Sequence, residues 1–159
     1  MSAATTPGTL HRLAIGTALL AAAAAPLALA VPAEATTSAR GCTVRPVRPA
    51  FAGTVAGVKQ VRYDVAFSCA GNRQIEIQQA FWELDAPPDP DDFNGYAWQS
   101  RTFAQPNVAL RGVTRPLDDD DLGNAEEIYQ NVRFRVSVGG GAFSSWTTYE
   151  SSPVLTIAN

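Results

Sequence analysis

Apolar and polar residues alternate over two long stretches of this chain, and this alternation excludes most folds. In the first stretch one parity is apolar: Val61, Tyr63, Val65, Phe67 and Cys69. The second stretch, residues 128–138, alternates in the same way. Successive side chains of a β-strand point to opposite faces, so each stretch predicts a strand with one buried face. No helical periodicity follows residue 35, and an all-β class is therefore predicted.

Further strands are predicted between the turn signals. The full set is residues 42–51, 61–69, 74–84, 96–103, 108–113, 128–138, 143–149 and 154–158. Pro46 and Pro49 place the first strand at a sheet edge, because proline cannot donate to the ladder. The third strand changes parity, which predicts a bulge near residues 78–80 or a strand buried on both sides at its end. About seven or eight strands in one small domain favour a two-layer antiparallel sandwich.

The stretch NVRFRVSVGGGAFSSWTTYESSPVLTIA, residues 131–158, resembles the last hairpin of immunoglobulin-like domains such as fibronectin type III. In both, an alternating strand and a Gly-rich turn lead to a return rich in Ser and Trp and then to a final strand. The resemblance implies a single immunoglobulin-like antiparallel β-sandwich. The sequence departs from the family at its conserved tyrosine, since Tyr129 lies too early and Val132 occupies the nearest matching place. The resemblance implies no activity, because this architecture hosts unrelated functions.

Residues 1–35 have the order of a secretory signal peptide. A polar start that ends at Arg12 precedes an Ala-rich apolar run, and small residues then lie at cleavage spacing before Ala30 and Ala35. We expect cleavage after residue 35, with residue 30 as the alternative. Secretion to the extracellular space follows, with no membrane segment after cleavage. Residues 36–41 would be a short flexible N-terminus, and residues 42–159 the β-sandwich domain.

Two cysteines, Cys42 and Cys69, lie in the part of the chain that export would retain. An even number of cysteines in an oxidising compartment predicts one disulfide bond. The bond would close a loop of about 28 residues and would stabilise the fold by roughly 3.5 kcal/mol on the loop-entropy model.

Several chemistries are excluded by what the chain lacks. Its only histidine is His11, inside the predicted signal, so histidine-based triads and zinc sites are not expected. No nucleotide-binding glycine motif is present, and no cofactor is predicted. A net charge of −3 gives no reason to expect nucleic acid as a partner.

Four consecutive aspartates, Asp118 to Asp121, are the most conspicuous charged feature. In an extended chain Asp118 and Asp120 point one way and the other two point away, so only two could face one ion. Calcium needs six to eight oxygen ligands. We therefore predict a solvated loop and no metal site, with Asp118 and Asp120 as weak calcium candidates.

The aromatic residues Trp82, Tyr96, Trp98, Trp146 and Tyr149 allow two interpretations. They could fill the core, or they could form an exposed platform that binds a sugar or a protein. The leading functional hypothesis is a secreted, non-catalytic binding or structural module whose partner is an extracellular glycan, such as a cell-wall glycan, or a protein. The alternative is a calcium-assisted or carboxylate-based secreted hydrolase, with Glu76, Glu83 and Asp85 as nameable acids.

Overall fold

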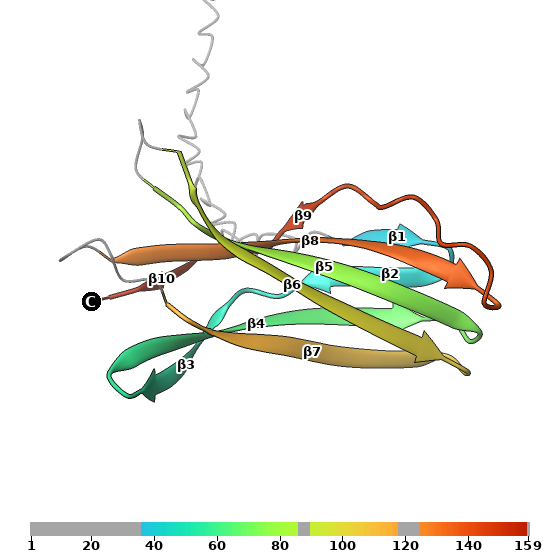
Figure 1. The fold of residues 1–159 in the computed structure, drawn as a ribbon, viewed down its shortest axis with the longest axis horizontal. Coiled ribbons are helices and arrows are strands. Elements are labelled where there is room, and N and C mark those ends of the chain that lie inside the picture. The colour runs from blue at the N-terminus through green and yellow to red at the C-terminus, as the bar shows by residue number, and fades with distance from the viewer. Residues whose placement is uncertain (1–35, 86–89, 118–124, 159) are drawn as a thin grey trace, which may run out of the picture. The chain divides into compact units, whose positions relative to one another are not determined.

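The computed structural model describes residues 36–85, 90–117 and 125–158, which form ten β-strands in two antiparallel sheets (Figure 1). The first sheet contains β1 (Thr37–Ala39), β2 (Cys42–Pro46), β3 (Ala50–Val55), β4 (Val58–Cys69) and β7 (Asn107–Pro116). The second contains β5 (Arg73–Glu83), β6 (Asp92–Phe103), β8 (Glu126–Val138), β9 (Glu150–Ser151) and β10 (Leu155–Ile157). The predicted all-β class is confirmed. The predicted signal, residues 1–35, lies outside the described residues.

Strand β4 is the centre of the first sheet. Strand β7 pairs along one of its edges, while β2 and β3 share the other edge in succession. The single strand predicted for residues 42–51 is therefore two strands, since Pro46 and Pro49 bracket the segment that leaves the ladder. Residues 37–39, expected within a flexible N-terminus, form β1 instead. Arg40 and Gly41, with φ angles of 46° and 80°, supply the tight turn that pairs β1 with β2.

Strand β5 is the centre of the second sheet, between β6 and β8. Its register against β8 is unbroken, so the bulge predicted near residues 78–80 is wrong. The irregularity lies in β6, where Phe81 pairs with Gly95 and Trp82 pairs with Phe93. The alternative prediction, a strand buried on both sides at its end, is confirmed. Ala80 on the outer face of β5 is only 2% exposed, and Phe81 on the inner face is 0% exposed.

The core lies between the two sheets. Apolar side chains of one parity on β2 and β4 meet those of β5 and β8. Ring contacts cross the layers, as between Tyr63 and Phe81, whose centroids are 4.5 Å apart. The predicted disulfide between Cys42 and Cys69 is confirmed, and it joins directly opposite residues of β2 and β4 within this core.

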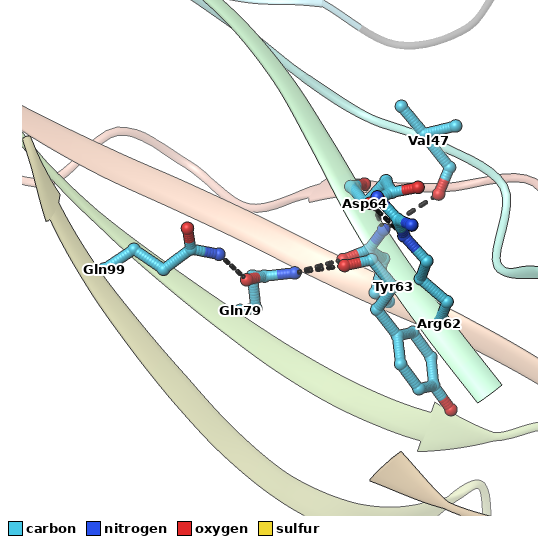
Figure 2. A network of polar contacts seen from close by, with 7 residues as sticks. Val47, Arg62, Tyr63, Asp64, Gln79 and Gln99 are labelled. Atoms are coloured by element: carbon cyan, nitrogen blue, oxygen red, sulfur yellow. Dashed lines mark hydrogen bonds and ion pairs between the residues drawn. The ribbon is translucent and has the colours of Figure 1, made fainter. Parts of the chain in front are cut away.

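Two fully buried glutamines, Gln79 and Gln130, interrupt this apolar interior. The Gln130 amide donates to the carbonyls of Val47 (2.8 Å) and Asp64 (2.7 Å), and the Gln79 amide donates to Gln130 Oε1 (2.8 Å) and to the Tyr63 carbonyl (3.3 Å). Figure 2 shows the chain of contacts across the layers. The glutamines lie where β4 passes from β2 to β3, so they satisfy backbone carbonyls at the gap between those strands.

The segment after β8 runs back along that strand (Figure 1), but residues 143–149 do not form the predicted strand. Ser144 and Thr147 replace the ladder instead. Their amides donate to the carbonyls of Val136 and Phe134, both at 2.9 Å, and their hydroxyls accept from the amides of the same two residues at 3.1 and 3.0 Å. The contacts recur every third residue, as in a polyproline II helix, and not every second as in a strand.

Candidate functional site: an aromatic face on the second sheet

The five aromatic residues singled out in the sequence lie on one face of the molecule. Register and contacts place Trp82, Tyr96, Trp98, Trp146 and Tyr149 on the outer face of the second sheet. The interpretation that they fill the core is wrong. Trp98 is 61% exposed and Tyr96 is 49% exposed, while the intervening Ala97 packs toward the core. We call this surface the aromatic face.

Two arginines of β8 hold one side of the aromatic face together. The Arg135 guanidinium lies 4.8 Å from the ring centres of both Phe143 and Trp146. The Arg133 guanidinium lies 5.1 Å from Trp146 and 4.7 Å from Tyr149. Rings and guanidinium groups therefore alternate, which favours cation–π attraction at each step. We call these five residues the arginine–aromatic ladder.

The ladder follows from the local chain geometry. Residues 144 and 147 face β8, so the residues immediately before them, Phe143 and Trp146, share another side of the segment, and Tyr149 continues the spacing of three. Arg133 and Arg135 are two apart on β8 and therefore point to the same face. The two spacings bring each arginine between two rings.

Hydrogen bonds to β5 fix the ladder from below. Glu76 Oε2 accepts from Arg135 Nε and Nη2, both at 2.7 Å. Gln78 Oε1 accepts from Arg133 Nε at 2.7 Å and from the Tyr149 hydroxyl at 3.0 Å. Burial raises the pKa of Tyr149, although the Arg133 charge opposes that shift. Hydrogen bonds to β5 therefore hold the side chains of the ladder in place.

Trp98 packs against the arginine–aromatic ladder but remains the most exposed of the three tryptophans. Its ring meets Trp146 edge to face, with centroids 5.6 Å apart and planes at 72°. An edge-to-face contact is a favoured arrangement of two aromatic rings, and it fixes the orientation of Trp98. Because Trp98 keeps 61% exposure, most of this large apolar ring faces solvent.

A second aromatic group continues the face along β6. The ring centroid of Phe93 lies 4.6 Å from that of Tyr96 and 5.1 Å from that of Trp82. Trp82 stacks on Tyr129, with ring centroids 6.4 Å apart and planes at 13°. The Tyr129 hydroxyl donates to Asp91 at 2.6 Å. Burial and this hydrogen bond to a carboxylate both raise the pKa of Tyr129. Exposed rings of β6 thus form a strip from Phe93 through Tyr96 to Trp98.

A hollow of about 300 Å³ opens beside Trp98 at one end of the strip. Its lining combines one ring with polar and charged groups: Glu76, Trp98, Gln99, Ser100 and Arg135. Glu76 and Ser100 are directly opposite each other on β5 and β6, so the hollow lies over paired strands and its floor is rigid.

A second hollow, of about 210 Å³, contains Arg115 and Tyr63. Arg115 Nη2 donates to the Asn94 carbonyl at 2.7 Å, and its guanidinium lies 4.8 Å from the Phe81 ring centre. Burial raises the pKa of Tyr63 to about 12, with a smaller opposing effect of Arg115. Arg115 thereby joins β7 of the first sheet to the bulge of β6 in the second. We therefore assign its contacts in this hollow a structural role.

Two of the three acids named for a hydrolase, Glu76 and Glu83, lie on opposite faces of β5. Glu76 points to the outer face and is bound by Arg135, whereas Glu83 has the inner parity of β5 and is 4% exposed. In residues 36–85, 90–117 and 125–158 no three His, Cys, Asp or Glu side chains gather as a metal site would require. The weak calcium candidates Asp118 and Asp120 lie outside the described residues. No helix in the described part of the chain could span a membrane.

No protein-family model matches the chain, and no curated protein matches its sequence.

Proposed function

We propose that this protein is a non-catalytic binding module and that the aromatic face binds a glycan. The observation that carries the proposal is the strip of exposed rings on β6, in which Trp98 is 61%, Tyr96 49% and Phe93 44% exposed. Contiguous exposed apolar surface marks an interaction site in a soluble protein. Flat rings beside hydrogen-bonding groups suit pyranose sugars, which present an apolar C–H face and a rim of hydroxyls.

The scaffold that we propose for this site is an immunoglobulin-like sandwich. Strands β2, β4 and β7 lie in one layer and β5, β6 and β8 in the other, so the chain changes layer after β4, β6 and β7. Crossings of this kind, with a core between two antiparallel sheets, support that class. We further propose that residues 1–35 direct export, and the Cys42–Cys69 disulfide supports an oxidising compartment.

Retention on cell-wall polysaccharide tests the proposed function. We expect Trp98→Ala combined with Tyr96→Ala to weaken retention by about tenfold or more, because central aromatic residues dominate binding energy. Leu110→Ala is the matched control, since this residue is 54% exposed on β7 of the other sheet. Equal retention of wild type, control and double variant would overturn the proposal, as would failure of the wild type to bind any polysaccharide or free glycan.

A further inference from the structure

We infer that the hollow beside Trp98 is the subsite for one neutral sugar unit and that Glu76 recognises its hydroxyls. The inference rests on the proposed function and deepens it, because it names the chemical class of glycan. At about 300 Å³ the hollow is at the lower end of the range of ligand pockets, roughly 300–1,000 Å³, which suits one monosaccharide unit. The adjoining strip toward Tyr96 leaves room for the glycan chain to continue.

Two polar groups of the hollow are open to a ligand, the Glu76 carboxylate and the Ser100 hydroxyl, and both can accept hydrogen bonds. Arg135 places both of its bonds on Oε2 of Glu76, and among the described residues Oε1 has no partner. Gln99 borders the hollow between Trp98 and Ser100, but its side chain has the inner parity of β6 and donates to Gln79 in the core, so it offers the ligand no acceptor (Figure 2). Ser100 is exposed at the rim. A ligand that supplies several donors, as a hydroxyl-rich sugar does, complements this lining.

The charges of the hollow favour a neutral sugar over an acidic one. Arg135, the arginine that lines the hollow, is paired with Glu76 and lies between the rings of Phe143 and Trp146. Its Nε and Nη2 are both bound to Glu76, so this edge of the guanidinium is not open for the bidentate contact that a uronate or sulfate group would need. The outward Glu76 Oε1 would repel such an anion. Trp98, beside the carboxylate, offers its ring to the apolar face of the same sugar unit.

Glu76→Gln tests the subsite, because it keeps the side chain's shape and removes the carboxylate. The probes are six-unit oligosaccharides of glucose, galactose, mannose and N-acetylglucosamine, each compared with oligosaccharides of uronic acids by calorimetric titration. We expect wild type to bind at least one neutral series more tightly than any acidic one. Glu76→Gln should weaken that binding by about fivefold or more, since bonds to a charged partner are the stronger ones. Asp64→Asn is the matched control, because it removes a carboxylate paired with Arg62 at 2.9 Å on the other sheet. It should leave the affinity for the oligosaccharides unchanged.

A second variant guards against misfolding. Ser100→Ala leaves the Glu76–Arg135 pair intact and should weaken neutral-sugar binding by about threefold, the effect of one lost hydrogen bond. The inference is overturned if acidic oligosaccharides bind more tightly, or if Glu76→Gln and Ser100→Ala both bind as wild type does while Trp98→Ala abolishes binding. That last result would leave the proposed function standing. If no probe and no polysaccharide binds to wild type, the proposed function and the inference both fail.

Discussion

The Gln130 amide, on β8, connects the second sheet to the first at the break between β2 and β3. Its two N–H groups meet two backbone carbonyls, those of Val47 and Asp64. We expect Gln130→Leu to lower the free energy of unfolding by about 2–4 kcal/mol, because it removes the donor to the Val47 carbonyl, one of two donors to the Asp64 carbonyl, and the acceptor of the buried Gln79 amide. Urea denaturation measures the change. Gln105→Leu, in the exposed turn before β7, should stay within about 0.5 kcal/mol, and equal losses in the two variants would contradict this role.

The sequence carries a signal for this residue. Gln79 and Gln130 have the inward parity of β5 and β8, where the alternating pattern otherwise places apolar side chains. A polar residue at an inward position must find a buried partner, so it indicates a network. The partners themselves, the Tyr63 and Val47 carbonyls, could not be predicted, because they lie at the gap that opens where β2 and β3 share β4.

Among the elements, the segment of residues 142–149 depends on hydroxyls that act as ladder acceptors. Thr147 Oγ1 accepts from the Phe134 amide at 3.0 Å. We expect Thr147→Val, which keeps the shape and removes the hydroxyl, to destabilise the protein by about 1–2 kcal/mol in thermal unfolding. Thr148→Val is the matched control on the exposed neighbour and should change stability by less than about 0.5 kcal/mol. If Thr147→Val loses no more stability than Thr148→Val, the Thr147 hydroxyl contributes no ladder bond.

This element also explains which site residues the sequence could not predict. Trp98 and Tyr96 are candidates from the sequence because they are aromatic, and the register of β6 against β5 places both on one face. The sequence pattern indicates no site role for Arg133 and Arg135, because their ring partners come from a different segment. Phe143, Trp146 and Tyr149 are spaced by three residues in the sequence. This spacing matches neither the period of a strand nor that of an α-helix, so it predicts neither element.

For the whole molecule, the alternation in β4 and β8 is enough to predict the all-β class and the buried faces. Local patterns also located most strands within a few residues. Pairing order was less accessible, since it depends on contacts between distant segments. The division of residues 42–51 between two strands on one edge of β4 is the clearest instance, because prolines indicate a break but not which strand resumes the pairing.

The disulfide acts on the stability of the whole molecule, because it joins β2 to the central strand β4 inside the shared core. Cys42 and Cys69 are 27 residues apart, so the bond restricts a long loop of the unfolded chain. We expect reduction to lower the free energy of unfolding by about 3–4 kcal/mol. Chemical denaturation with and without reductant measures this loss in the wild type. Cys42→Ala with Cys69→Ala should be at least as destabilised and should not respond to reductant. Two alkylatable thiols in the native, unreduced protein would contradict the prediction.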